Sequence, residues 1–250
     1  MNYIVGDIGN TLTKVSLLNQ NYKIVKSYII ETNKLNNKII LPKFLKKIIF
    51  KNINKKILFS SVVPITYNLI KKYLSKKNFT TIELKDLNIK NIIKLNVDNY
   101  RQLGSDRIAN AIGSLEYPKK NIIIIDFGTA TTFDVVNKNK NYDGGVIAPG
   151  INLSILNLHK STSLLPSLKL RKSNKPYGKN TKDAMNAGFL WGYQGLINNV
   201  IKKISKGRKN YIVILTGGYA TLFRKYLSKK SIVDQNITIK GIISVYKNLI

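Results

Sequence analysis

Residues 3–11 read Tyr-Ile-Val-Gly-Asp-Ile-Gly-Asn-Thr, and residues 122–132 read Ile-Ile-Ile-Ile-Asp-Phe-Gly-Thr-Ala-Thr-Thr. In each stretch an apolar run ends in Asp-x-Gly followed by small polar residues. Strand-like residues follow both copies, so each predicts a hairpin with a glycine-bearing turn and a carboxylate at its mouth. The two aspartates, Asp7 and Asp126, lie 119 positions apart, close to half of the 250 residues. The spacing predicts a duplicated half-domain whose two turns clamp phosphate groups and a metal ion.

The composition argues against several classes of site. The chain has no cysteine, which excludes disulfides, thiolate metal sites and cysteine nucleophiles. A single histidine, His159, makes a zinc enzyme or a Ser-His-Asp hydrolase a poor hypothesis. A chain of 250 residues can bury a real core in one large domain or in two lobes.

We expect neither a secretion signal nor a membrane span. The N-terminus begins at once with a strand that carries Asp7, without the charged and apolar segments of a signal peptide. The longest apolar runs, such as 122–125 and 212–215, fall far short of the ~20 residues that cross a bilayer. We therefore expect a cytoplasmic protein with no membrane partner.

The net charge of +30, from 42 Lys and Arg against 12 Asp and Glu, suggests an anionic partner such as nucleic acid. The basic residues are spread along the chain, however, and most are lysine, whereas sequence-specific readers favour the bidentate fork of arginine. Abundant Lys, Asn and Ile indicate A/T-rich coding instead. We expect nonspecific polyanion binding at low salt and no specific nucleic-acid partner.

The hydrophobic pattern predicts alternating strands and helices in two lobes, residues 1–116 and 117–250. The expected strands cover 2–8, 13–18, 22–30, 57–59, 80–84, 122–126, 132–137 and 211–215, with one more near the C-terminus. The expected helices cover 41–50, 64–74, 105–115, 151–160 and 181–203, and two more follow the strand at 211–215. Residues 142–150 are a glycine-rich segment. Small residues along the helix at 181–203 predict close packing against another element.

The motif at residues 7–14 fits a phosphate site. Its glycine lets the backbone approach a phosphate, its Asn and Thr donate hydrogen bonds, and Lys14 neutralises phosphate charge. Asp7 would hold a hydrated Mg²⁺. An ordinary hairpin turn explains the same residue types. The second copy favours a functional interpretation, because Asp126 ends a buried strand at the edge where α/β sheets bind ligands.

Residues 100–107 place an acid between two arginines and near an aromatic ring. A helix N-cap is the simpler explanation of Asp106, and the local pattern favours it. In the functional interpretation Asp106 is the general base for an attacking hydroxyl, and Arg107 binds an anionic group of the acceptor. The arginine would then keep Asp106 ionised.

Two further signals are weaker. The turn Thr216-Gly217-Gly218 follows a strand, and beside a nucleotide site it would pass under the adenine or the ribose. Thr181 begins a long helix and is most simply its N-cap, with a ligand role as the alternative. We assign no chemistry to His159 or Trp191.

The ordered set of motifs resembles type III pantothenate kinases, within the superfamily of actin, hexokinase and Hsp70. The hairpin loops alone resemble the superfamily, and the full set is more specific because its order and spacing match over most of the chain. The motifs that carry the resemblance are residues 7–14, 104–107, 126–132, 142–150, 165–166 and 216–218.

The resemblance implies an α/β fold with two ribonuclease H-like lobes of duplicated topology, the actin-like ATPase fold, in which helices flank mixed five-stranded sheets. It also implies ATP-dependent phosphorylation of pantothenate at its terminal hydroxyl, the first step of coenzyme A synthesis. The implied cofactors are Mg²⁺ and a monovalent cation, K⁺ or NH₄⁺, and the implied assembly is a homodimer.

The resemblance also implies the site residues, by matching position. Asp106 would be the proton acceptor, and Asp126 would bind K⁺ or NH₄⁺. The implied ATP contacts are Asp7, Ile8, Gly9, Asn10, Thr11, Leu12, Thr13, Lys14 and Thr129. The implied pantothenate contacts are Tyr100, Gly104, Ser105, Asp106, Arg107 and Thr181. Ser105 departs from the alanine that is usual in the family, which leaves only local hydrogen bonding in doubt.

Two alternatives stay open. One fold serves many acceptors, so another small-molecule kinase or a phosphohydrolase is the alternative enzyme. The charge of +30 leaves a basic nucleic-acid-binding regulator as the alternative outside enzymes. Phosphoryl transfer asks the protein mainly for positioning and charge neutralisation, which the glycine turns and carboxylates can supply.

Overall fold

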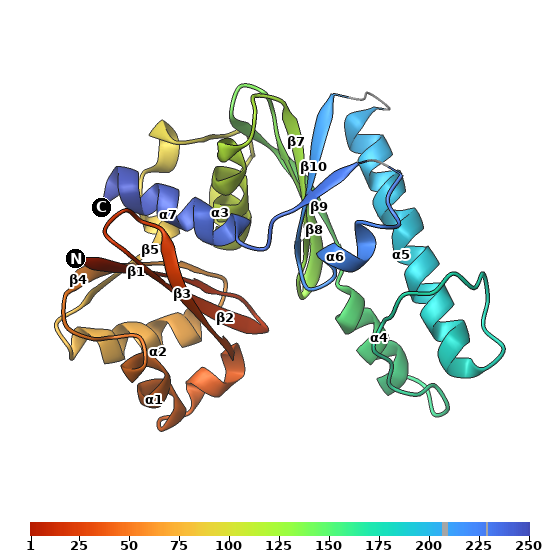
Figure 1. The fold of residues 1–250 in the computed structure, drawn as a ribbon, viewed down its shortest axis with the longest axis horizontal. Coiled ribbons are helices and arrows are strands. Elements are labelled where there is room, and N and C mark those ends of the chain that lie inside the picture. Colours follow the sequence, from red (N-terminus) through yellow and green to blue (C-terminus); the bar gives the residue numbers. More distant parts are fainter. Residues whose placement is uncertain (207–209, 229) are drawn as a thin grey trace. The chain divides into compact units, whose positions relative to one another are not determined.

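The computed structural model describes residues 1–206, 210–228 and 230–250, which form two compact units (Figure 1). Unit 1 consists of Met1–Tyr117, Lys140–Tyr142 and Asn236–Ile250, and unit 2 consists of Pro118–Asn139 and Asp143–Gln235. The first boundary lies one residue from the expected one. The C-terminal segment, which we had expected in the second lobe, clusters with unit 1.

Unit 1 is built on a five-stranded sheet in the order β3-β2-β1-β4-β5. The first three strands form an antiparallel meander, and β4 and β5 run parallel to β1. Its elements are β1 (Asn2–Ile8), β2 (Leu12–Leu18), β3 (Ile24–Glu31), η1 (Thr32–Asn36), α1 (Ile40–Lys46), β4 (Ile53–Ser61), α2 (Pro64–Ser75), β5 (Thr80–Glu83), η2 (Leu84–Asp86), η3 (Ile89–Asn91), β6 (Lys94–Leu95), η4 (Tyr100–Gln102), α3 (Ser105–Gly113), η5 (Ser114–Glu116) and α7 (Ile237–Leu249), where η denotes a short 3₁₀ helix.

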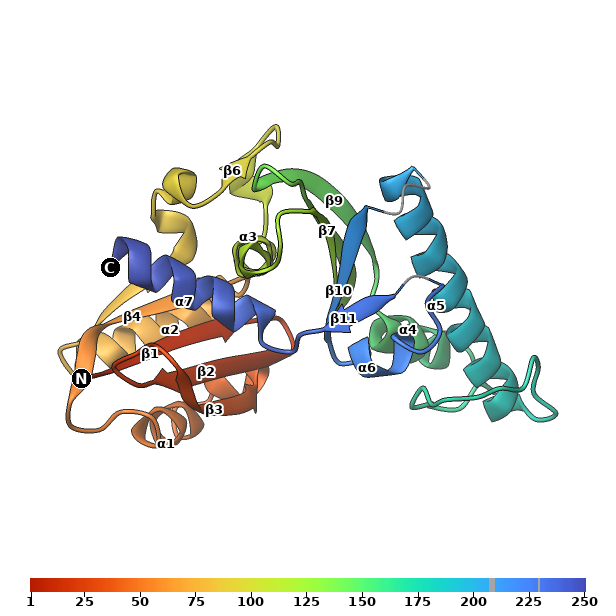
Figure 2. The ribbon, with the colours of Figure 1, turned by 45° about the horizontal axis from the view of Figure 1, so that its top comes forward.

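Helices cover both faces of this sheet. Alternate residues of β1, Ile4 and Ile8, join a core cluster with side chains of α1 and α2 such as Phe44 and Ile70. Figure 2 shows α7 on the opposite side of the sheet from α1. Unit 1 is therefore a three-layer sandwich in which the sheet is the middle layer.

The C-terminal helix belongs to unit 1 because α3 and α7 approach closely. A Cβ atom added at Gly113 would overlap the backbone carbonyl of Ile237, and one added at Gly241 would overlap that of Ala109. The Thr238 hydroxyl also donates to Asn110 Oδ1 at 2.6 Å. These contacts join residues more than 100 positions apart, which the local sequence pattern does not reveal.

The second sheet repeats the strand order of the first. Its order is β11-β10-β7-β8-β9-β6, so β9-β8-β7-β10-β11 corresponds to β3-β2-β1-β4-β5. We expected five strands, and the sixth is the two-residue β6, which pairs in parallel with the first residues of β9. The elements are β7 (Asn121–Phe127), β8 (Ala130–Val136), β9 (Asn141–Pro149), α4 (Ile151–Lys160), α5 (Thr181–Ser205), β10 (Tyr211–Gly217), α6 (Ala220–Phe223) and β11 (Ser231–Val233).

Unit 2 packs its helices on one face of the sheet. Ile123, Ile125 and Phe133 of β7 and β8 form a cluster with Leu190 and Ile197 of α5. The cluster also contains apolar residues of α4 and α6. The burial of β7 on this face fixes its register, so that Asp126 lies on the other face.

The glycine-rich segment at 142–150 is mostly the strand β9. The close packing expected of the small residues along α5 is absent at its glycines, since no described atom lies within 4 Å of a Cβ added at Gly188, Gly192 or Gly195, whereas Ala187 is buried. Within residues 1–206, 210–228 and 230–250, no helix combines the length and apolar character of a membrane span.

Candidate functional site

The turn between β1 and β2 presents the predicted phosphate-binding residues. The Gly9 N–H donates to the Leu12 carbonyl at 3.0 Å and closes the turn. Thr32 supports the turn from the side, because its hydroxyl donates to Gly9 O at 2.6 Å and its N–H donates to Thr11 O at 2.9 Å. Asn10 and Thr11 are exposed at the tip. The hydrogen bonds hold the turn while its tip faces outward.

Asp7 lies one residue before the end of β1 and is half-buried. Its Oδ1 atom accepts a hydrogen bond of 3.1 Å from the hydroxyl of Ser60 on the parallel strand β4. Lys14 pairs with Asp7 across the hairpin and donates from Nζ to Asn236 Oδ1 at 2.6 Å. A carboxylate and an ammonium group therefore stand together at the base of the turn.

The segment 104–107 begins helix α3. Gly104 is the N-cap residue and no side chain bonds the cap, so the simpler interpretation of Asp106 as the N-cap is wrong. Asp106 is the second helical residue, and its Oδ1 accepts the N–H of Arg107 at 2.8 Å. The carboxylate of Asp106 therefore lies within the first turn of α3 and does not cap the helix from outside.

Burial raises the pKa of Asp106 above its ordinary value. The N–H and the positive charge of Arg107 lower that pKa, and so does the charge of Lys85. Together these effects do not cancel the effect of burial. We had expected Arg107 to favour the ionised form of Asp106; it acts in that direction, and burial has the larger effect on the pKa. A raised pKa makes the carboxylate a stronger proton acceptor once it is ionised.

Glu83, at the end of β5, links three chain segments, and our sequence reasoning missed it. Its Oε1 accepts the hydroxyl of Ser105 and the N–H of Ser61, the latter at 3.2 Å, and its Oε2 accepts the N–H of Lys85 at 2.6 Å. Burial raises the pKa of Glu83, and these three hydrogen bonds act in the opposite direction. An acid at the end of a strand, in a chain with only 12 acids, was the available signal.

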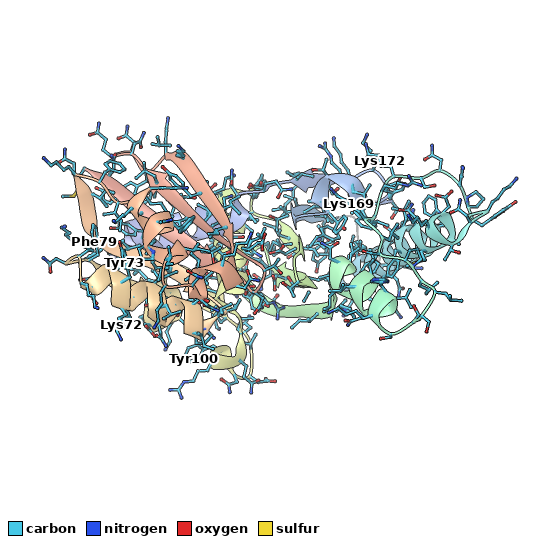
Figure 3. All side chains as sticks on the ribbon, turned by 90° about the horizontal axis from the view of Figure 1, so that it is seen from below. Lys72, Tyr73, Phe79, Tyr100, Lys169 and Lys172 are labelled. Carbon is cyan, nitrogen blue, oxygen red and sulfur yellow. The ribbon has the colours of Figure 1, made fainter. Side chains whose placement is uncertain are left out.

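Tyr100 and Arg107 lie on either side of the helix start. Tyr100 is half-exposed in η4, where Figure 3 shows its side chain. The guanidinium carbon of Arg107 lies 6.0 Å from the ring centre of the buried Tyr142. The aromatic face fixes this cation beside Asp106.

In unit 2, Asp126 has the same place in its sheet as Asp7. It stands one residue before the end of β7, beside Thr216 of the parallel strand β10. Gly217 follows with φ +81°, and a Cβ added there would lie 2.6 Å from Asp126 Oδ1. Thr129 is exposed in the turn between β7 and β8. The Gly217 turn and Asp126 are thus neighbours.

Thr181 is the first residue of α5 and is exposed. The N-cap is Asn180, whose side chain accepts the N–H of Asp183 at 2.9 Å, so the capping interpretation of Thr181 is wrong. His159 Nδ1 is hydrogen-bonded to the Leu165 carbonyl. The Trp191 indole N–H donates to the Lys175 carbonyl.

Within unit 1, the predicted residues form two groups that the end of β4 connects. Val62 N donates to Ile8 O at 3.1 Å, and a Cβ added at Gly104 would lie 3.6 Å from Val62 Cγ1. The neighbouring Ser61 N reaches Glu83. The phosphate turn and the helix start with Asp106 therefore share one support.

Two units of identical strand order, each with a carboxylate at the end of its first strand, define a member of the actin-like ATPase fold. A Baf family protein from Campylobacter jejuni has a similar structure, with a TM-score of 0.63 and 23% identity over 98% of this chain and 100% of that one. The polyphosphate/ATP-glucomannokinase of an Arthrobacter strain has a TM-score of 0.52 and 10% identity, with 97% of each chain covered. These likenesses concern the fold.

The sequence comparisons define the family within this fold. The sequence profile of type III pantothenate kinase matches residues 3–203. A type III pantothenate kinase of Pelagibacter ubique is 48% identical over 246 residues, 96% of each chain. This chain belongs to the type III pantothenate kinase family. The activity of that family, ATP-dependent phosphorylation of pantothenate in coenzyme A biosynthesis, confirms the function expected from the motifs.

Proposed function

We infer that Asp106 accepts the proton of the terminal pantothenate hydroxyl while this hydroxyl attacks the γ-phosphorus of ATP. The new bond joins the hydroxyl oxygen to phosphorus, and the bond from phosphorus to the β,γ-bridging oxygen breaks, so ADP leaves. The burial of Asp106 at the start of α3 carries this proposal, since it raises the pKa of the carboxyl. Because Oδ1 accepts the Arg107 N–H, we assign the proton to Oδ2.

We assign the ATP phosphates to the turn of residues 8–14 and a hydrated Mg²⁺ to Asp7. The exposed turn tip suits phosphate binding, and a half-buried carboxylate at the end of a strand is the oxygen ligand that Mg²⁺ prefers. When bound, Mg²⁺ would neutralise phosphate charge. Lys14 adds a positive charge, and Asn236 holds its side chain in place.

We assign the monovalent cation, K⁺ or NH₄⁺, to Asp126, with Thr129 as an ATP contact. Two oxygen atoms support this assignment: Asp126 Oδ1 and the Phe127 carbonyl oxygen both lie close to Gly217, since each would be 2.6 Å from a Cβ added there. Thr129 is exposed in the adjoining turn, where a hydroxyl can donate to ATP.

For pantothenate, we assign a stacking or covering role to Tyr100, backbone contact to Gly104, and charge pairing with the carboxylate to Arg107. The side chain of Ser105 is fully buried and donates to Glu83, so any contact with pantothenate comes from its backbone. This hydrogen bond also answers the question that its departure from alanine raised.

Product formation from purified protein tests the assignment of Asp106. With ATP, Mg²⁺ and K⁺, the wild type should produce ADP and phosphopantothenate, as measured by mass spectrometry, and Asp106→Asn should lower kcat on the order of 10²- to 10⁴-fold. A panel of other hydroxyl acceptors with ADP as readout addresses the alternative enzymes. If Asp106→Asn turns over at nearly the wild-type rate, Asp106 is not the base.

We also propose a homodimer in which Thr181 completes the partner's pantothenate pocket. The support is an uncovered surface of unit 2: α5 exposes Gly188, Gly192 and Gly195, and α4 exposes Leu153 and Leu156. Glycines on a helix allow another backbone to approach closely, and the leucines supply apolar area.

Light scattering of Gly192→Arg tests this surface. The substitution raises helix propensity, so the variant should fold, and it should shift the protein towards the monomer with weaker pantothenate binding. Asn68→Arg, at an exposed position of α2, is the matched control and should leave the mass unchanged. A fully active monomeric wild type would refute the proposal.

The cytoplasmic location stays a prediction.

A further inference from the structure

We propose that Glu83 and Lys85, which lie outside the family motifs, form a brace that positions the acceptor segment 100–107 and its base. This inference rests on the role proposed above for Asp106. Neither residue carries out the chemistry. Their contribution is to fix where Asp106 stands and how strongly it holds a proton.

The brace holds the acceptor segment at two points. Lys85 Nζ donates to the carbonyl of Arg101 at 2.8 Å, and Glu83 Oε1 accepts the hydroxyl of Ser105. The two anchored residues are four positions apart and lie on either side of the turn that ends η4 and begins α3. Because both holding groups come from residues 83–85, at the end of β5 and in η2, the segment cannot shift at one end without straining the other.

The brace is itself fixed to the phosphate side of unit 1. Glu83 accepts the N–H groups of Ser61 and Lys85, so its carboxylate has three donors. Ser61 follows Ser60, whose hydroxyl bonds Asp7. A carboxylate held by backbone N–H groups is a rigid anchor, since charge-assisted hydrogen bonds are stronger than neutral ones. The brace thus fixes Asp106 relative to the turn that we assign to ATP.

Lys85 also acts through its charge. The groups around Asp106 are Arg107 on its own helix, Lys85 from η2 and, through Ser105, Glu83 with Asp86 beside it. The charge of Lys85 lowers the pKa of Asp106 and so opposes the effect of burial. Removing this charge should therefore raise the pKa and move the acidic limb of the pH profile to higher pH.

The first experiment measures kcat/KM for pantothenate against pH. Lys85→Gln should shift the acidic limb to higher pH, and Lys85→Arg should restore the wild-type profile because it keeps the charge and a donor. Lys90→Gln makes the same charge change at an exposed position of η3 and should leave the profile unchanged. An unshifted limb in Lys85→Gln, or an equal shift in Lys90→Gln, would overturn the role of Lys85.

The second experiment tests Glu83 in two backgrounds. In Glu83→Gln one carboxylate oxygen becomes an amide N–H₂, which cannot accept a hydrogen bond. This group then faces either the Lys85 N–H or the donors of Ser61 and Ser105, so at least one hydrogen bond to residue 83 is lost. We expect a fall in kcat of about ten- to a hundredfold, with KM for ATP unchanged, because misplaced catalytic groups lose rate before they lose binding. In the Asp106→Asn background the same change should cost nothing further, since the group being positioned is gone.

The outcomes separate the two proposals. An equal loss in both backgrounds, accompanied by a lower Tm, would make Glu83 a structural residue only. If Asp106→Asn is nearly inactive while Glu83→Gln and Lys85→Gln behave as wild type, the brace is wrong and the base assignment stands. If Asp106→Asn keeps its turnover, Asp106 is not the base, and the brace, which rests on that role, is overturned with it.

Discussion

Gly104→Ala tests the placement of the base by the smallest possible change. An ideal Cβ at this position would lie less than 3.0 Å from Asp106 Oδ1, whereas ordinary contact begins at 3.4 Å. The backbone at Gly104 has φ −60° and ψ 140°, which alanine adopts freely. The conflict is therefore with the side chain of Asp106 alone, because the next neighbour, Val62, stays 3.6 Å away.

The carboxylate must retreat by roughly 1 Å, and a misplacement of that size costs on the order of 100-fold in rate. Stability should change little, because the gain of about 0.4–1 kcal/mol from replacing glycine by alanine at a compatible backbone position is offset by alanine being a poorer N-cap residue than glycine. The assay is steady-state kinetics with a thermal melt on the same preparation. We expect kcat to fall about 100-fold with Tm close to that of the wild type.

Gly113→Ala is the matched contrast, because there the new methyl group meets the backbone carbonyl of Ile237 rather than a mobile carboxylate. This variant should lose about 1–3 kcal/mol of stability while the folded molecules keep their turnover. Combining Gly104→Ala with Asp106→Asn should add nothing to the loss caused by Asp106→Asn alone. If Gly104→Ala keeps kcat within about threefold of wild type at an unchanged Tm, Asp106 is not the group whose position limits the reaction.

Three other predictions concern the charge of Asp106, the cation at Asp126 and the net charge of the chain. Because burial raises the pKa of Asp106 in the folded protein, its charge costs stability above that pKa, and the cost disappears as the pH falls through it. Asp106→Asn should therefore melt above the wild type near neutral pH, and the difference should close during melts taken towards about pH 4; a constant difference would contradict the assigned cause. Gly217→Ala combines a φ of +81° with a Cβ placed 2.6 Å from both Asp126 Oδ1 and the Phe127 carbonyl oxygen, so it should lower Tm and abolish the stimulation by K⁺ over Na⁺; unchanged K⁺ stimulation would count against Asp126 as the ligand. In a salt titration, binding to DNA driven by the charge of +30 should collapse equally for all sequences, and sequence-selective binding at physiological salt would support a regulatory role.

The sequence predicted the parts of the fold that local pattern determines. The four isoleucines before Asp126 form a buried strand because positions 122–125 of β7 are all apolar and β-branched. Helix α4 covers Ile151–Lys160, the range expected from its apolar spacing, with Gly150 as its N-cap. The duplication could be recognised for the same reason, since each Asp-x-Gly turn is specified by a few consecutive residues.

Contacts between distant segments were beyond this reasoning. The two residues of β6 are a strand only because β9 lies beside them, and β9 itself has two glycines within it. The role of Glu83 depends on a hydroxyl 22 residues further along the chain. The assignment of α7 to unit 1 depends on the close approach at Gly113 and Gly241. In each case the deciding partner is brought close by the fold, so no local period or cap could indicate it.

The surroundings of the three aspartates explain why the proposed chemistry is divided among them. Asp7 and Asp126 stand at strand ends beside hydroxyl residues of the neighbouring parallel strand, Ser60 and Thr216, and Ser60 donates to Asp7. Asp106 is instead placed where burial raises its pKa, which suits a group that takes up a proton. A strand-end turn that must open to a nucleotide cannot also be buried, so a base with a raised pKa has to come from a separate element, and α3 provides it.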